Sequence, residues 1–142
     1  ALRAAGLGRR VLVAQFLKGG VSQGPEGSVH LCGRLEWIRP SIPCCLAQAV
    51  HDEPDLNPFS DHIQAVQAVW KICKQLIIKG NLDLMVLDEV GLASALGYLN
   101  ENDLISTLDQ RTSSMDIILT GPSIPPRVID MADQFTELRC GN

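Results

Sequence analysis

The chain has 142 residues, of which 46% are hydrophobic, and its formal net charge is −4. This length is enough for one compact domain and too short for two ordinary ones, so we expect a single domain over residues 1–142. The acidic balance, without any Lys/Arg-rich run, argues against a surface for nucleic acid or anionic membranes. No apolar stretch approaches the ~18–20 residues of a membrane span and no signal peptide is visible, so we expect a cytoplasmic protein.

The five cysteines are odd in number and include no Cys-x-x-Cys pair, which favours reduced cytosolic thiols over disulfides. The alternative is a metal site built from His and Cys side chains that lie close together in the sequence. Its candidate ligands are His30, Cys32, Cys44, Cys45 and His51. Their spacing matches no zinc module, so this is the weaker reading.

The first elements in chain order are a short helix and a buried strand. Residues 1–6 are rich in Ala and Leu, which predicts the last turns of a helix with a left-handed cap at Gly6. Residues 11–17 form an almost wholly apolar run, typical of a strand buried on both faces of a parallel sheet. Because a helix that feeds a buried parallel strand follows another strand, we expect the first strand and the turn after it to be missing from this chain.

Residues 35–38 are a candidate short strand, which Pro40 stops. Four prolines among Ser, Asn and Asp between residues 39 and 58 predict a long loop, and structureless loops of that length tend to be functional. We therefore expect residues 20–58 to be a loop-rich segment on the substrate side.

Residues 59–79 carry the strongest helical pattern, with apolar residues at helical spacing, Ser60 as the N-cap and Gly80 at the end. The later elements alternate between the two types. They are a strand at 82–87, a helix at about 101–110 capped by Asn100, a strand at 115–120, a short helix opened by Pro125 and Pro126, and a last strand at 134–138. This alternation predicts an α/β fold around a parallel sheet.

Two carboxylates, Asp88 and Glu89, directly follow the apolar run at 82–87. Open parallel sheets bind ligands beyond the carboxyl ends of their strands. Mg²⁺ prefers a carboxylate together with water and phosphate oxygens. The pattern is that of a Walker B site, in which the Asp holds the water shell of the metal and the Glu orients a nucleophile. The alternative is a strand that simply ends in acidic residues and caps the next turn.

Lys18, Gly19 and Gly20 leave the carboxyl end of the first buried run. A Lys beside two glycines offers a positive charge and exposed main-chain amides to an anion. The alternative, which is commoner for a lone Lys-Gly-Gly, is a flexible turn with a solvated Lys.

Taken together, three blocks of the sequence resemble the P-loop type of ATP:corrinoid adenosyltransferases. Residues 1–20, which read Ala-Leu-Arg-Ala-Ala-Gly-x-Gly-x-Arg-Val-Leu-Val-x-Gln-Phe-x-Lys-Gly-Gly, resemble the second strand of that family and the helix before it. Residues 84–99, with Val-Leu-Asp-Glu and then Gly-Tyr-Leu, resemble its Walker B segment. Residues 108–139, with Ile-Ile-Leu-Thr-Gly and Thr-Glu-Leu, resemble its C-terminal stretch.

The resemblance implies a RecA-like P-loop NTPase fold, with a mainly parallel sheet flanked by helices. It implies an enzyme that moves the 5′-deoxyadenosyl group of ATP onto the reduced cobalt of a corrinoid in adenosylcobalamin biosynthesis, and releases triphosphate. By the same resemblance, Asp88 and Glu89 would face Mg²⁺ and the phosphates. The residues expected on the nucleotide side are Lys18, Gly19, Thr120 and Gly121. The family is usually dimeric, which makes a homodimer a candidate state.

The chain departs from the family pattern in three places. It contains no Gly-x-x-x-x-Gly-Lys-Ser/Thr phosphate loop, which the family carries just upstream of the block that matches residues 1–20. Pro122 stands where the family usually has an Arg, and residues 40–58 hold no counterpart of its Phe-Thr-Trp segment. Two hypotheses therefore stay open: an adenosyltransferase, or a degenerate relative that binds nucleotide, corrinoid or a protein partner without turnover. Within the strands, we interpret Gln15 as structural and expect Trp37 to serve core packing.

Overall fold

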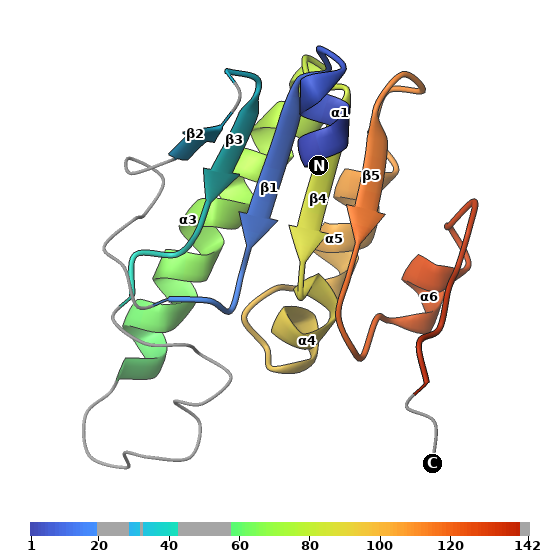
Figure 1. The fold of residues 1–142 in the computed structure, drawn as a ribbon. Helices are drawn as coiled ribbons and strands as arrows, with labels where there is room; N and C mark the ends of the chain where they lie inside the picture. Colours follow the sequence, from blue (N-terminus) through green and yellow to red (C-terminus); the bar gives the residue numbers. More distant parts are fainter. Residues whose placement is uncertain (20–28, 32, 43–57, 140–142) are drawn as a thin grey trace.

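The computed structural model describes residues 1–19, 29–31, 33–42 and 58–139 of the chain. Within these residues a five-stranded sheet has the order β2-β3-β1-β4-β5. The strands are β1 (Val11–Gln15), β2 (Val29–Leu31), β3 (Leu35–Ile38), β4 (Leu84–Asp88) and β5 (Asp116–Leu119). Strands β3, β1, β4 and β5 run parallel, whereas β2 pairs with β3 in the antiparallel sense. All four parallel arrows in Figure 1 therefore point the same way, so their carboxyl ends share one edge.

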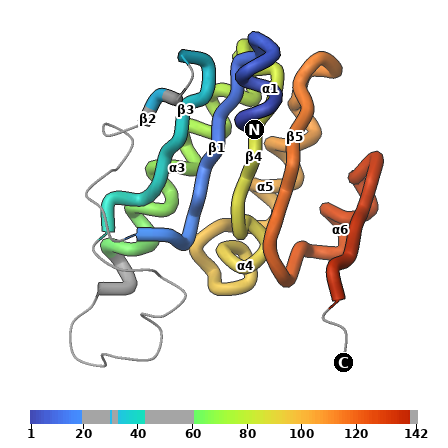
Figure 2. Tube along the Cα trace, in the orientation of Figure 1, coloured from blue at the N-terminus to red at the C-terminus, as the bar shows by residue number. Residues whose placement is uncertain are grey.

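Helices cover the two faces of this sheet unequally. They are α1 (Leu2–Gly6), α3 (Pro58–Lys79), α4 (Val90–Ala95), α5 (Glu101–Leu108) and α6 (Pro126–Ile129). The long helix α3 and α5 lie behind the sheet in Figures 1 and 2, whereas the short helix α1 lies in front of it. Helix α4 sits below the carboxyl end of β4, at the edge where the parallel strands end.

Period-two alternation along the strands divides the apolar side chains between the two faces. Leu12 and Ala14 of β1 join the larger core, which also includes Met85 of β4 and Val66 of α3. Val11 and Val13 point to the other face and pack in a smaller cluster with Ala5 of α1. Because both faces are covered at β1, all five of its residues are buried, as its apolar run predicts.

The long helix begins and ends at residues with clear backbone roles. Helix α3 begins at Pro58, a residue favoured in the first turn because it has no N–H to leave unpaired. Ser60 therefore lies inside the helix, and its prediction as the N-cap was wrong. At the other end, Gly80 has φ of +62° and donates its N–H to the carbonyls of Leu76 and Ile77, which confirms the predicted glycine stop.

Most predicted elements are confirmed to within a few residues, and the α/β class with a mainly parallel sheet is confirmed. The predicted last strand at 134–138 was wrong, since these residues form neither helix nor strand. Phe135 is 60% exposed and Leu138 is 94% exposed, so neither side chain is buried against a neighbouring strand. The left-handed turn after α1 is at Gly8, with φ of +86°, and not at Gly6, which belongs to the helix.

Much of the predicted loop-rich segment at 20–58 lies outside the described residues. The parts of it that are described include β2, which no sequence pattern indicated, and β3, whose predicted bounds are confirmed. No helix in the described part of the chain is long and apolar enough to cross a membrane.

Candidate functional site

The carboxyl edge of the parallel sheet gathers side chains that lie far apart in the sequence. Gln15 ends β1 and pairs in register with Asp88, which ends β4. Lys18 follows β1, and Thr120 directly follows β5. Parallel sheets place their ligand sites at this edge, and here four polar side chains meet there.

Both oxygens of the Asp88 carboxylate accept hydrogen bonds. The hydroxyl of Thr120 donates to Oδ1 at 2.6 Å, and the amide Nε2 of Gln15 donates to Oδ2 at 2.7 Å. The ammonium of Lys18 stands 3.9 Å from the same Oδ2. The Asp88 side chain is 25% exposed and that of Lys18 is 50% exposed, so the site opens to solvent on one side. Two short hydrogen bonds, one from β1 and one from the residue after β5, fix the direction of the carboxylate while leaving it accessible.

Gln15 is itself held by an indole from the next strand. Trp37 of β3 donates its Nε1–H to Oε1 of Gln15 at 2.9 Å. The guanidinium carbon of Arg39 lies 5.7 Å from the centre of the Trp37 ring, within the range of a cation–π contact. Gln15 is only 6% exposed, and both ends of its amide are paired. A chain of hydrogen bonds thus runs across three adjacent strands, from Trp37 through Gln15 to Asp88.

The backbone after β4 turns sharply and packs against the backbone after β5. Glu89 has φ of +61° and stands at the N-cap position of α4, and its N–H donates to the Thr120 hydroxyl at 3.2 Å. Gly121 has φ of +105°, and a Cβ placed on it would lie 2.8 Å from the Cα of Glu89. A Cβ on Gly91 would lie 2.6 Å from the carbonyl oxygen of Pro122. The two segments touch so closely that glycine is required on each side of the contact.

The amino-acid sequence of the chain is similar to that of a known protein family. A family model described as "ATP:corrinoid adenosyltransferase BtuR/CobO/CobP" matches residues 1–141. The chain belongs to this family. The corrinoid adenosyltransferase of Pseudomonas aeruginosa is 29% identical to it over 146 residues, which cover 96% of this chain and 64% of that protein. The corrinoid adenosyltransferase CobA of Salmonella typhimurium is 31% identical over 139 residues, covering 98% and 66%. The chain therefore spans 64–66% of the length of these two relatives.

Family membership and the observed sheet agree on the fold class. The four parallel strands, flanked by helices, are consistent with a P-loop NTPase-like fold of the adenosyltransferase family. In that setting β4 ends in the acidic pair, and β1 and β5 lie on either side of it. The resemblance to this family that the sequence motifs indicated is confirmed.

The carboxylate at the end of β4 fits a magnesium ion whose other ligands are water and the phosphate oxygens of a bound molecule. Among the described residues no group of three or more His, Cys, Asp or Glu side chains could hold a metal by itself. Mg²⁺ needs only one or two carboxylates when waters and phosphate oxygens complete its shell. Asp88 is ionisable, fixed in direction and partly exposed, and each of its oxygens keeps a further lone pair. Of the five alternative zinc ligands only His30 lies among the described residues, so that site stays untested.

The structure brings most of the predicted site residues together. Lys18, Asp88 and Thr120 are linked by the contacts above, and Glu89 and Gly121 are joined by their backbones.

For two residues of the hydrogen-bond chain, the sequence predicted a smaller role than the structure shows. Gln15 and Trp37 reach Asp88 through hydrogen bonds, so Trp37 does more than pack in the core. One signal was present, because a Gln inside a fully buried strand must find hydrogen-bond partners. Gly19, the remaining predicted residue, directly follows Lys18 and is partly buried.

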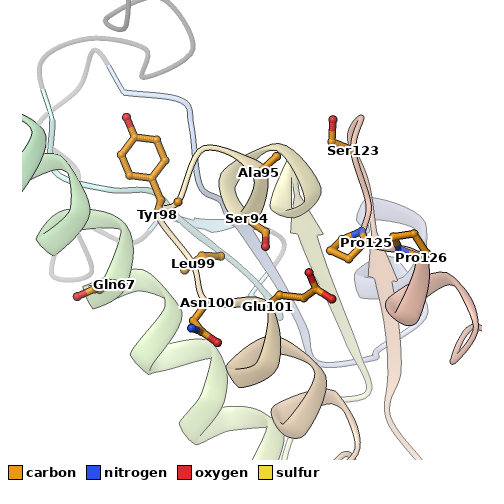
Figure 3. Close-up of a pocket in the computed structure, with 11 residues that line it drawn as sticks. Gln67, Ser94, Ala95, Tyr98, Leu99, Asn100, Glu101, Ser123, Pro125 and Pro126 are labelled. Carbon is orange, nitrogen blue, oxygen red and sulfur yellow. The ribbon is translucent and has the colours of Figure 1, made fainter.

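A separate hollow of about 490 Å³ lies between α3, the turn after α4 and the segment after β5. Figure 3 shows Gln67, Tyr98, Glu101 and Pro125 among the side chains around it. Its lining includes no Lys or Arg, and none of the residues that contact Asp88. Because positive charge favours the binding of a triphosphate, the carboxyl edge with Lys18 is the better phosphate site of the two.

Proposed function

We propose that the protein transfers the 5′-deoxyadenosyl group of ATP to a reduced corrinoid in adenosylcobalamin biosynthesis. The observation that carries the proposal is the Asp88 carboxylate, fixed by Gln15 and Thr120 at the carboxyl edge of the sheet with Lys18 beside it. The family of the chain supports the same reaction, as do relatives whose names are corrinoid adenosyltransferases.

In this proposal Asp88 and Glu89 hold Mg²⁺ at the phosphates of ATP. The ion, when bound, neutralises negative charge on the triphosphate as it leaves. The ammonium of Lys18 adds a second positive charge on the same side, and the absence of a side chain at Gly19 allows a phosphate or a ribose to approach the backbone closely. At Gly121 the corresponding space is filled by the backbone of Glu89, so this glycine shapes the turn beside the nucleotide. Thr120 contributes by holding both Asp88 and the turn at Glu89 in place.

The chemistry asks for positioning rather than for proton transfer. The electron pair of the reduced cobalt attacks C5′ of ATP, the cobalt–carbon bond forms, and the bond from C5′ to the triphosphate oxygen breaks. No proton needs to be removed from either reactant in this step, so the site requires no general base. This matches a carboxylate whose two oxygens are already engaged as acceptors. The protein lowers the barrier by alignment and by charge compensation on the leaving group.

A second candidate is a relative that binds nucleotide, corrinoid or a protein partner without turnover. Two features of the sequence favour it: Pro122 offers neither a charge nor an N–H next to Gly121, and residues 40–58 hold no counterpart of the Phe-Thr-Trp segment of the family. For the transferase we propose a cytoplasmic protein that acts on small molecules and forms a homodimer.

An anaerobic assay of the full-length protein with ATP, Mg²⁺ and chemically reduced cobalamin separates the two candidates. We expect the absorption spectrum of a light-sensitive adenosylated corrinoid to develop above the rate seen without protein. If no product forms while an active adenosyltransferase turns over under the same conditions, the transferase proposal is wrong. Binding of ATP or cobalamin in that case would favour the second candidate.

A further inference from the structure

The hydrogen-bond chain from Trp37 through Gln15 to Asp88 joins side chains of β3, β1 and β4. We infer that Gln15 and Trp37 are positioning residues, which hold the Asp88 carboxylate in the one direction that suits a Mg²⁺-bound nucleotide. The inference rests on the proposed function, because it assigns Asp88 to that ion. It adds two residues that touch neither the ion nor the nucleotide.

The donor and acceptor properties of the three side chains determine the direction of the hydrogen-bond chain. An indole N–H can only donate, and an ionised carboxylate can only accept. The amide of Gln15 lies between them and has one end of each kind, so one of its two orientations satisfies both neighbours. The flipped amide would set its carbonyl against the Asp88 carboxylate and its NH₂ against the indole N–H. Trp37 therefore determines which end of Gln15 faces Asp88.

Burial makes this arrangement rigid. Gln15 is 6% exposed, so water cannot readily replace a lost partner at either end of the amide. Asp88 is held from two sides, with Gln15 of β1 on Oδ2 and Thr120 after β5 on Oδ1. The ring of Trp37 is in turn contacted by the guanidinium of Arg39, which restrains the indole. Groups that orient a metal-binding carboxylate in this way change metal affinity about 10–100-fold when they are removed in other proteins.

A matched pair of tryptophan variants tests the role of the indole. Trp37→Phe removes one N–H and keeps an aromatic ring. Trp70→Phe makes the same change at the second tryptophan, whose Nε1–H donates to Asp103 at 2.7 Å, on the helical side of the molecule. We measure the Mg²⁺ concentration that half-saturates ATP binding in the full-length protein, together with ATP affinity in the absence of Mg²⁺.

We expect Gln15→Leu to raise the half-saturating Mg²⁺ concentration about tenfold or more, and Trp37→Phe to raise it about threefold, because the indole acts one bond further away. Trp70→Phe should leave it unchanged, and ATP affinity without Mg²⁺ should be the same in all variants. Equal Mg²⁺ dependence in Trp37→Phe and Trp70→Phe would overturn the inference. So would a Gln15→Leu protein that matches the wild type.

A spectroscopic test stands apart from nucleotide binding, so that failure of the proposed function can be told from failure of this inference. The chain has two tryptophans, which give two indole N–H signals in a ¹H–¹⁵N spectrum. Asp88→Asn should move the Trp37 signal and leave the Trp70 signal in place, and the shift should vanish when Gln15→Leu is also present. An unmoved Trp37 signal would refute the hydrogen-bond chain. A moved signal in a protein without Mg²⁺-dependent ATP binding would support the hydrogen-bond chain but contradict its proposed role in orienting Asp88 for Mg²⁺.

Discussion

Replacing Gly121 by alanine should disturb the carboxyl edge of the sheet through an unfavourable backbone conformation and a close backbone contact. The φ of +105° at Gly121 is a conformation that L-residues rarely adopt. The added Cβ would also lie 2.8 Å from the Cα of Glu89 and 3.4 Å from its carbonyl carbon. Both are backbone atoms, and Glu89 is itself held at φ of +61° at the start of α4. The contact cannot be relieved by rotating a side chain.

Two contributions set the expected loss of stability. An L-residue in a left-handed conformation costs about 1–2 kcal/mol. Forcing a methyl group into a closely packed contact costs about 1–3 kcal/mol more. Gly121→Ala should therefore lower the free energy of unfolding by about 2–5 kcal/mol. Gly97→Ala is the matched control, since Gly97 has φ of +80° but a Cβ placed on it would meet nothing within 4 Å, so only the first contribution of about 1–2 kcal/mol applies.

Urea unfolding of the two variants measures this difference, provided that the m value stays that of the wild type. The Mg²⁺-dependent affinity for ATP should fall in Gly121→Ala as well, because a displaced Glu89 backbone would weaken its bond to the Thr120 hydroxyl. Gly97→Ala should keep that affinity. Equal losses of stability in the two variants, with equal ATP affinity, would show that the close approach of Gly121 to Glu89 is absent.

Two further predictions concern the Thr120 hydroxyl and the carboxylate of Asp103. Thr120→Ala removes the donor to Asp88 and should destabilise the protein by about 1–3 kcal/mol in urea unfolding, whereas Thr120→Ser keeps the hydroxyl and should lose less than half as much. Burial raises the pKa of Asp103, but hydrogen bonds from Trp70 and Lys74 and the charge of Lys74 outweigh it, so the pKa lies below its ordinary value. A lowered folded-state pKa stabilises the protein above the unfolded value of about 3.9 and loses that contribution as the pH falls through the folded-state pKa. Asp103→Asn should thus be less stable than the wild type at pH 7, with the difference closing below about pH 4; a difference that stays constant with pH would contradict this.

The sequence predicted those parts of the fold that depend on local apolar pattern. The buried run at residues 11–15 and the helical spacing in α3 each predict one element. Burial on two faces leaves a continuous apolar run, and burial of one helical stripe leaves a period in the sequence. The same reasoning failed at 134–138, whose two apolar residues, Phe135 and Leu138, are three positions apart and remain exposed. Strand β2 has three residues, too few for any period, and depends on its antiparallel partner β3.

Some residues of the candidate site could be predicted from the sequence and others could not. The acidic pair at the end of β4 could be predicted because it follows an apolar run. Lys18 could be predicted because it follows the apolar run of β1. The link from Trp37 to Gln15 to Asp88 was not visible, because it depends on the order of β3, β1 and β4 in the sheet. Gln15 and Asp88 are 73 residues apart in the chain, and only the register of β1 against β4 sets them side by side.

The Mg²⁺ dependence of ATP binding in Asp88→Asn, measured by calorimetry on the full-length protein, tests the proposed nucleotide site most directly. Asn keeps the size of the side chain and removes its charge. Asp103→Asn is the matched control, since Asp103 is another partly exposed carboxylate that accepts side-chain hydrogen bonds, here from Trp70 and Lys74. We expect Asp88→Asn to lose the gain in ATP affinity that Mg²⁺ provides, while Asp103→Asn retains it. An Asp88→Asn protein that binds ATP as the wild type does, with and without Mg²⁺, would contradict the assignment of this edge as the nucleotide site.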